Sequence, residues 1–361
     1  MLKSTSNKVN TVAVIEVDGS HDECLLTQLF ALKQAKKSIL LICTQTLKDR
    51  NTQFESLVDE FSIIDSSLKH KTVVKHICNT LKSKKVELAI FNTAQGAKVR
   101  DVCLKMLFSK IKFFGIIHTT RKFEGSRTQR LINFKIKNYF LLSEFLFNKV
   151  TPPNGIHLAY FYPIRFPEFN TNKIKNDTLT VSIIGGVEKR RKDLEGFVKM
   201  VENTSSMNVK YIFIGKSDSK NEDVIALKTA LTQKNLLKNV QLFDNFISQE
   251  EFDAYLQQTD LILPIVHPNT PSADQYFKNQ ISGAVNVGFG YKIPLLIHEG
   301  YDNVTELKER ALFYNLDNFK AVLEDAKEKV SMIQQHMEND IELKNETQEK
   351  RYLNFLFSEN N

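Results

Sequence analysis

The chain contains no tryptophan, only four cysteines and few residues that break regular structure. Its 361 residues include 13 glycines and 8 prolines, which excludes a collagen-like or low-complexity disordered chain. Apolar runs such as Ser38–Cys43 are far shorter than the roughly 20 residues that span a bilayer, and the N-terminus shows no apolar leader segment. The cysteines have no paired metal-ligand spacing, so we expect reduced and mostly buried thiols, as in a cytoplasmic protein: Cys24, Cys43, Cys78 and Cys103.

Charge is shared unevenly along the chain, whose net charge is +7. Residues 1–150 carry about 25 Lys/Arg against about 13 Asp/Glu, which suggests that this half meets something anionic. Two stretches, 102–112 and 127–137, combine Lys/Arg with Phe and Leu, as helices at an anionic membrane surface do. A lysine-rich solvated surface, with helices that have ordinary basic outer faces, is the alternative. A nucleic-acid partner is not expected, because no RRM, OB or helix-turn-helix signature accompanies the pI of about 9.0.

Apolar runs of strand length alternate with segments of helical period in the first half of the chain. Near-continuous apolar strands joined by helices are typical of a parallel sheet that is covered on both faces. Helices are predicted at Glu23–Lys36 and Ala97–Ser109. The predicted strands are Thr11–Val17, Ser38–Thr44, Val86–Asn92, Lys112–His118 and Asn138–Leu142.

The alternation stops at residues 151–177, which hold four prolines and a polar stretch, and then restarts. Helices are predicted at Asp193–Val201, at Ser282–Phe289 and after the capping-box sequence Ser248–Glu251. The predicted strands are Leu179–Ile184, Lys210–Ile214, Asn239–Phe243, Asp260–Val266 and Pro294–His298.

We therefore predict an α/β fold of two doubly wound, Rossmann-like domains that face a cleft. The N-terminal domain is expected at 1–150, a linker at 151–177 and the C-terminal domain at 178–335. A polar C-terminal helix at 336–361 could cross back to the first domain.

Three features of the second half suggest a phosphate-bearing ligand. The first is an apolar strand that ends in glycines and leads into a basic cluster; glycines admit a ligand close to the backbone, and the cations can grip a diphosphate. The second is a helix start with open backbone amides, and the third is a polar loop after a strand. The structural alternatives are a glycine turn with a solvated basic helix, a packed crossover helix and an ordinary loop. The residues are Gly185, Gly186, Arg190, Arg191 and Lys192, then Ser282, Gly283 and Ala284, then Asp274 and Tyr276.

The order of these motifs over about residues 179–300, through to Gly290–Ile297, resembles the C-terminal domain of GT-B-fold glycosyltransferases. The similarity is greatest to the retaining group of bacterial polysaccharide enzymes, glycosyltransferase family 4-like or group 1. The resemblance implies that the glycine turn and basic cluster (Gly185–Lys192) and the helix start (Ser282–Ala284) meet the donor diphosphate. One departure is that Asn279 and Val287 stand where that family often has two glutamates.

Two histidines follow predicted strands of the first half, at the edge that would face the cleft. A histidine such as His118 at a strand end resembles the family's cleft histidine, and His21 is the second candidate. Either could donate a hydrogen bond to the sugar or act as a base, and either could be a loop residue without a role. Gly19 and Arg121 lie beside them and are assigned to the acceptor side.

The sequence thus predicts a hexosyltransferase-type glycosyltransferase that moves a sugar from a UDP- or GDP-sugar to a glycan or lipid-linked acceptor, in surface polysaccharide or glycoconjugate synthesis. We expect no cofactor and no metal, because no Asp-x-Asp-type site stands out and the Arg/Lys cluster can take a metal's role. The expected location is the cytoplasm, with contact at the inner face of the membrane left open. A nucleotide-sugar epimerase and a non-catalytic partner subunit of the same fold are the alternatives.

Overall fold

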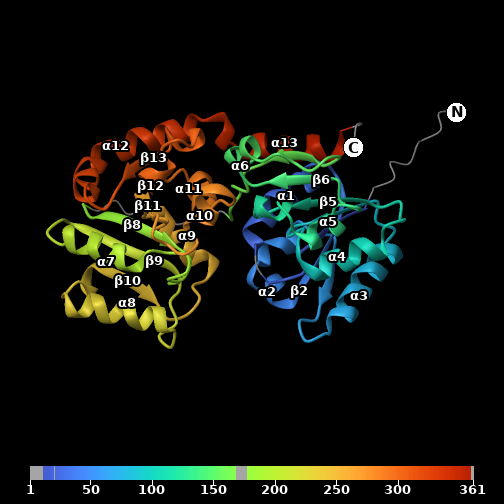
Figure 1. Cartoon of the computed structure of the whole chain (residues 1–361), viewed down its shortest axis with the longest axis horizontal. Coiled ribbons are helices and arrows are strands. Elements are labelled where there is room, and N and C mark those ends of the chain that lie inside the picture. The colour runs from blue at the N-terminus through green and yellow to red at the C-terminus, as the bar shows by residue number, and fades with distance from the viewer. Residues whose placement is uncertain (1–10, 20, 168–176, 359–361) are drawn as a thin grey trace. The chain divides into compact units, whose positions relative to one another are not determined.

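The chain forms two compact units, one built from residues up to Arg165 together with Asn345 onward, the other from Phe166 to Lys344 (Figure 1). The structure, a computed structural model, describes residues 11–19, 21–167 and 177–358. Each unit holds one fully parallel sheet with helices packed on it. The predicted α/β class with two Rossmann-like domains is therefore confirmed.

The first unit has a seven-stranded sheet in the order β3-β2-β1-β4-β5-β6-β7. Its central strands are the apolar runs that the sequence predicts, and they are buried along their length. The strands are β1 (Thr11–Ile15), β2 (Ser38–Thr44), β3 (Glu60–Ile64), β4 (Leu88–Phe91), β5 (Lys112–Ile116), β6 (Asn138–Leu141) and β7 (His157–Tyr160). The helices are α1 (Leu25–Gln34), α2 (Gln45–Arg50), α3 (His70–Ser83), α4 (Gly96–Lys105), α5 (Arg127–Ile132), α6 (Glu144–Lys149) and α13 (Asn345–Phe357).

The two edge strands of this sheet, β3 and β7, were not predicted. Both are mostly half-exposed, so neither shows the continuous apolar run of a central strand. β7 lies inside the stretch that we expected to be a linker. All four cysteines are free and buried, as expected.

Helix α13, the last helix in the described part of the chain, packs against α1 and β7 of the first unit. Tyr352 is fully buried, stacks on Phe140 with ring centroids 4.7 Å apart, and donates a hydrogen bond to Gln28. Arg165 forms an ion pair with the buried Glu349 at 2.5 Å. These contacts attach the last helix to the same unit as the first strand.

The second unit has a six-stranded sheet in the order β10-β9-β8-β11-β12-β13. The predicted capping box at Ser248 is present, with Ser248 and Glu251 each accepting from the other's backbone amide. The strands are β8 (Leu179–Ile184), β9 (Val209–Lys216), β10 (Val240–Phe243), β11 (Leu261–Ile262), β12 (Leu295–His298) and the unpredicted β13 (Ala311–Tyr314). The helices are α7 (Leu194–Asn203), α8 (Glu222–Gln233), α9 (Gln249–Gln257), α10 (Ala273–Lys278), α11 (Gly283–Tyr291) and α12 (Phe319–Asn339).

Strand β11 is much shorter than the predicted Asp260–Val266. Pro264 has no backbone N–H to continue the ladder, and Ile265 has a φ of 55°, which turns the chain away from the sheet. The predicted boundary between residues 335 and 336 falls inside α12. None of the helices in the described ranges is long and apolar enough to cross a membrane.

Candidate active site

Buried polar residues gather at the carboxyl edge of the first unit's sheet, where Glu16 follows β1. Glu16 is fully buried and accepts hydrogen bonds from the amide N of Asp18 (3.0 Å), Nδ2 of Asn92 (2.8 Å) and Oγ1 of Thr93 (2.7 Å). Burial raises the pKa of Glu16, and these hydrogen bonds offset part of the rise. The carboxyl group therefore ties the loop after β1 to the loop after β4.

Asn92 carries this network on to His21. Its Nδ2 also donates to the main-chain oxygen of His21 (2.8 Å), and its Oδ1 accepts from Gln28 (2.7 Å). His21 has a φ of 63°, in the left-handed region that most residues avoid. The hydrogen bonds of Asn92 thus fix a strained loop with the His21 ring in one position.

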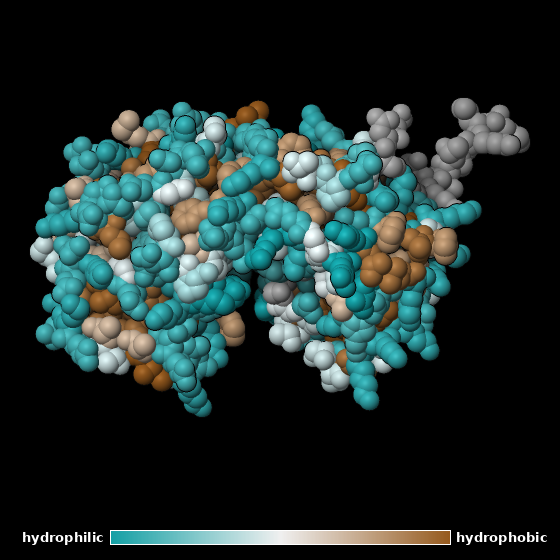
Figure 2. All heavy atoms as spheres, in the orientation of Figure 1, coloured by the Kyte–Doolittle hydropathy of each residue, from teal (hydrophilic) through white to brown (hydrophobic). Residues whose placement is uncertain are grey.

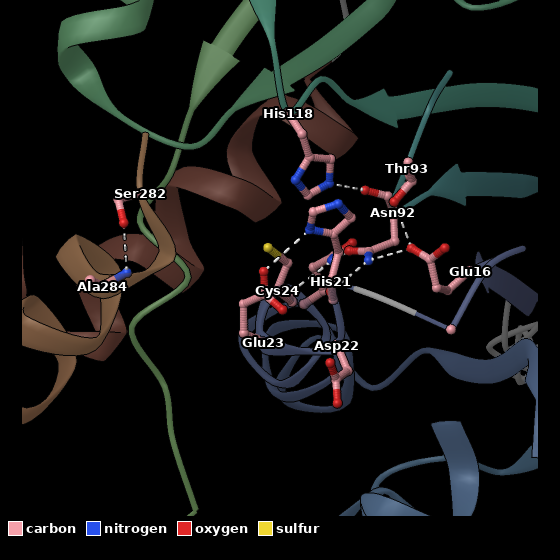
Figure 3. A network of polar contacts seen from close by, with 12 residues as sticks. Glu16, His21, Asp22, Glu23, Cys24, Asn92, Thr93, His118, Ser282 and Ala284 are labelled. Carbon is pink, nitrogen blue, oxygen red and sulfur yellow. Dashed lines mark hydrogen bonds and ion pairs between the residues drawn. The ribbon is translucent and has the colours of Figure 1, made fainter. Parts of the chain in front are cut away.

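The rings of His21 and His118 stack with centroids 3.8 Å apart (Figure 3). Nε2 of His118 lies 2.8 Å from the main-chain oxygen of Asn92, which can only accept, so Nε2 carries the proton. Burial, and then the charge of His21, lower the pKa of His118 to about 4. His118 is therefore neutral near pH 7, and its Nδ1 has a lone pair that can accept a hydrogen bond.

Glu23 supplies a negative charge beside this histidine pair. Its Oε1 lies 3.3 Å from Nδ1 of His21, so the two form an ion pair when His21 is protonated. Burial by itself would raise the pKa of Glu23, but the hydrogen bond from His21 and the charge of that ring lower it overall. The edge thus presents a carboxylate, a histidine that pairs with it and a neutral histidine, in contact with one another.

The acceptor-side candidates lie around this cluster. The main-chain oxygen of Gly19 accepts from Arg50 (2.7 Å), and there is open space where a Gly19 side chain would be. Arg121 is exposed, in the turn that follows Thr120 after β5. Asp22 forms an ion pair with Arg50 and accepts a hydrogen bond from Asn51, so its negative charge is already balanced within the protein.

In the second unit, Gly185 and Gly186 form a tight turn at the end of β8. Gly185 has a φ of 83°, and a side chain on Gly186 would come within 2.6 Å of the main-chain oxygen of Lys216 in β9. A side chain on Gly215 would likewise collide with Gly185 at 2.5 Å. Only glycine therefore fits here, and the turn leaves its backbone uncovered by side chains of its own.

Lys192 is buried beside this turn. Its side chain is about 8% exposed, and its Nζ lies 3.7 Å from where a Gly185 side chain would begin. Burial lowers the pKa of Lys192 to about 8, against the opposing effect of Glu188. Its Nζ forms no hydrogen bond or ion pair with any residue that the structure describes. Glu188, whose charge opposes the effect of burial, also meets Arg190 and Arg191, so an anion bound at the turn would further stabilise the lysine cation.

The neighbouring arginines differ from Lys192 in exposure. The side chains of Arg190 and Arg191 are 64% and 50% exposed. Both approach the Glu188 carboxylate, Arg191 at 3.2 Å. Ser272 donates a hydrogen bond to the main-chain oxygen of Arg190 at 2.5 Å. The cluster predicted as one group thus consists of a buried lysine and two arginines near the surface that share the Glu188 carboxylate.

A buried chain of polar groups supports the residue after Lys192. Oδ2 of Asp193 lies 2.8 Å from Nδ1 of His267, whose Nε2 lies 2.6 Å from the hydroxyl of Tyr314. The hydrogen bond from His267 lowers the pKa of Asp193, and burial raises that of Tyr314, so the phenol stays protonated and donates. Asp193 also caps α7 through the amide of Gly196.

Backbone strain marks the same place. Ile265 is fully buried, and its φ of 55° is unfavourable for a β-branched residue. Its main-chain oxygen accepts from the amide of Asp193 at 3.0 Å. The strained turn therefore joins the end of β11 to the start of α7 and sets the position of His267.

Helix α11 begins where the sequence predicts, with Ser282 as its N-cap. Oγ of Ser282 accepts from the amide of Ala284 (Figure 3), and nothing lies within 4 Å of where a Gly283 side chain would be. The helix packs on β8 and β11, the two adjacent central strands. Its open N-terminus is thus at the same sheet edge as the Gly185 turn.

Two loop candidates are placed differently from one another. Tyr276 is buried, near the charges of Arg190 and Arg191. The side chain of Asp274 is 88% exposed and pairs with Lys278 on its own helix. Of the positions that replace the family's glutamates, Asn279 follows α10 and Val287 is buried in α11.

The sequence analysis did not single out five residues of these networks. Glu16 could have been noticed, because it directly follows an apolar strand and buried acidic residues are rare unless they are paired. Asn92, Glu23, Asp193 and His267 depend on partners far away in the sequence, so no local pattern identifies them.

No protein-family model and no curated protein matches the chain. Solved structures match it along nearly its whole length. A glycosyltransferase from Rickettsia africae is 11% identical over 97% of this chain and 98% of that one, with a TM-score of 0.66. Anabaena HepE, in complex with UDP and glucose, is 13% identical over 97% and 100%, with a TM-score of 0.67.

A UDP-GlcNAc 2-epimerase from Neisseria meningitidis, bound to UDP-GlcNAc, is also similar. It is 11% identical over 96% of this chain and 99% of that one, with a TM-score of 0.60. Glycosyltransferases and epimerases are thus both among the similar structures. At such low identity the likeness shows the fold alone. The chain has the fold of the GT-B glycosyltransferases.

Proposed function

We propose that this protein is a glycosyltransferase that transfers a sugar from a UDP- or GDP-sugar to a glycan or lipid-linked acceptor. The observation that carries the proposal is Lys192, a buried lysine whose Nζ forms no hydrogen bond and lies beside a turn of glycines. The diphosphate of the donor would neutralise this charge. The same cation would favour departure of the nucleoside diphosphate, because the negative charge on the diphosphate grows as its bond to the sugar breaks.

The donor diphosphate would be held by groups at the carboxyl edge of β8 and β11. The Gly185–Gly186 turn admits phosphate oxygens close to the backbone, and the N-terminus of α11 offers the amides after Ser282. Arg190 and Arg191 reach from the surface and could exchange Glu188 for phosphate oxygens. This arrangement needs no metal ion, because cations and amides provide the positive charge.

The sugar and acceptor chemistry is assigned to the histidine cluster of the first unit. Neutral His118 can accept a hydrogen bond from a sugar hydroxyl at Nδ1, while His21 paired with Glu23 can donate one. Acceptor binding is assigned to the loops that carry Gly19 and Arg121. Anabaena HepE, which has the same fold, was solved with UDP and glucose, and this supports a uridine nucleotide as the first donor to test.

Titration calorimetry with UDP, GDP and ADP on wild-type protein and Lys192→Met tests the donor site. Methionine keeps the length of the side chain without the charge, and an apolar group of similar volume at a buried position leaves the fold intact. We expect at least a tenfold loss of affinity in Lys192→Met. Lys199→Met, which changes an exposed lysine on α7, is the matched control and should bind like wild type. Equal affinity in all three proteins contradicts the proposal.

Epimerisation of a nucleotide sugar is the second candidate, because two carboxyl groups and two histidines lie together in the first unit: Glu16, Glu23, His21 and His118. Such groups could move protons on a sugar ring. NMR spectra of a UDP-sugar incubated with the enzyme and no acceptor separate the two functions. A sugar of changed configuration, still linked to UDP, identifies an epimerase; release of UDP that requires an acceptor identifies a transferase.

A further inference from the structure

Lysines line the amino edge of the first unit's sheet, opposite the edge that carries the histidine cluster. In a parallel sheet every strand begins at the same edge, so residues just before the strands lie along one row. Four of the seven strands have a lysine pair at their start. The pairs are Lys36 and Lys37 at β2, Lys84 and Lys85 at β4, Lys110 and Lys112 at β5, and Lys135 and Lys137 at β6.

Few carboxylates balance this row. Asp59 and Glu60, at the start of β3, pair with Lys33 and Lys84, and Glu87 lies before β4. Residues 102–143, which include the starts of β5 and β6, contain Glu124 as their one acidic residue. Five basic residues of the same stretch lie in or beside the loops that lead into β5 and β6: Lys105, Lys110, Lys112, Lys135 and Lys137.

Two phenylalanines stand exposed on this row. Phe108 is 97% exposed and Phe134 61%, and they lie in the loops that lead into the adjacent, paired strands β5 and β6. Nζ of Lys135 donates to the main-chain oxygen of Ser109 (2.7 Å), which holds the two loops together. Figure 2 shows a brown patch within a teal surface on this unit, over the region where α4 ends.

We propose that this amino edge docks on an anionic lipid bilayer, with Phe108 and Phe134 inserted at the headgroup level and exposed lysines such as Lys36, Lys85, Lys110 and Lys137 against lipid phosphates. Exposed aromatic side chains surrounded by lysine are the composition of an interfacial anchor. Two rings offer far less than the roughly 800 Å² that each partner contributes to a stable protein interface, which favours a lipid surface over a protein. The histidine cluster lies at the opposite edge of the sheet, away from the proposed docking face.

Flotation with vesicles tests this docking and needs neither donor nor acceptor, so its outcome is separate from that of the proposed function. We expect wild-type protein to float with vesicles of phosphatidylcholine and phosphatidylglycerol, and less with phosphatidylcholine alone. The double variant Phe108→Ser/Phe134→Ser should lose about tenfold in partitioning. Lys110→Ala and Lys137→Ala should each lose about fivefold, and added salt should weaken wild-type binding.

Phe246→Ser is the matched control, because Phe246 is 80% exposed but belongs to the second unit. It should float like wild type, and circular dichroism should show that all variants are folded. Three outcomes overturn the proposal: no flotation of wild type, equal flotation with both vesicle types, or unchanged flotation of the double variant. Flotation that fails while the double variant alters the solution mass would assign the surface to a protein contact instead.

Discussion

The ring of His267 joins Asp193 to Tyr314, with Nδ1 2.8 Å from Oδ2 of Asp193 and Nε2 2.6 Å from the phenol oxygen of Tyr314. Asp193 directly follows Lys192 and caps α7. The chain of hydrogen bonds therefore fixes the residue next to Lys192 to the end of β13, the last strand of this sheet.

His267→Ala should destabilise the second unit, because it leaves the Asp193 carboxylate and the Tyr314 hydroxyl without their partner. An unsatisfied buried polar group costs about 1–3 kcal/mol, so we expect a loss of about 3 kcal/mol in the free energy of unfolding. Urea unfolding measures this loss. His298→Ala is the control: it removes a half-buried ring from the same region and should cost less. Equal losses would mean that the Asp193–His267–Tyr314 chain has no special role.

Gly186→Ala and Gly283→Ala should act in opposite directions. A methyl group on Gly186 would meet the main-chain oxygen of Lys216 at 2.6 Å, so the turn must shift, with a loss of stability and of nucleotide affinity. Gly283 has open space around it and starts α11, where alanine is the better helix former by up to about 1 kcal/mol. Thermal unfolding with and without UDP compares the two, and a Gly186→Ala protein that behaves like wild type would contradict the packing of this turn.

His118 should make the protein less stable as the pH falls. Its pKa is about 4 in the fold against an ordinary value of 6.5, so between these values the unfolded chain binds a proton that the folded chain excludes. The contribution of His118 to the free energy of unfolding is fully present above pH 6.5. It is lost as the pH falls toward 4, and its size is on the order of 3 kcal/mol.

His118→Gln isolates this effect, because its amide can still donate to the main-chain oxygen of Asn92 but does not titrate. Urea unfolding between pH 4 and 7 should show a flatter pH dependence for the variant than for wild type. Identical slopes would show that His118 is not the group responsible. Glu16, whose pKa is raised, is present in both proteins and drops out of the comparison.

Local sequence patterns predict the central strands and the caps of this fold well. β2 and β4 are almost entirely apolar, and Ser248 and Ser282 cap their helices as expected. The edge strands β3 and β7 are half-exposed, so their patterns resemble those of loops.

The candidate site is only partly readable from the sequence. Gly185, Gly186 and Lys192 stand together in one motif. Lys192 is buried, whereas Arg190 and Arg191 reach the surface. This difference depends on how the turn packs against β9 and β11, which the motif does not encode. The contact between Asp193 and His267 joins residues 74 positions apart, and only the order of the strands brings them together.

The most direct test of the account is the proton uptake that accompanies UDP binding near pH 8, measured by calorimetry in buffers of different ionisation enthalpy. Lys192 has a pKa of about 8 without ligand, and a bound diphosphate raises it, so wild-type protein should take up protons and bind less tightly as the pH rises above 8. Lys192→Met should bind at least about tenfold more weakly, with no uptake. UDP binding that is equally tight and equally proton-linked in both proteins would contradict the donor site proposed at Lys192.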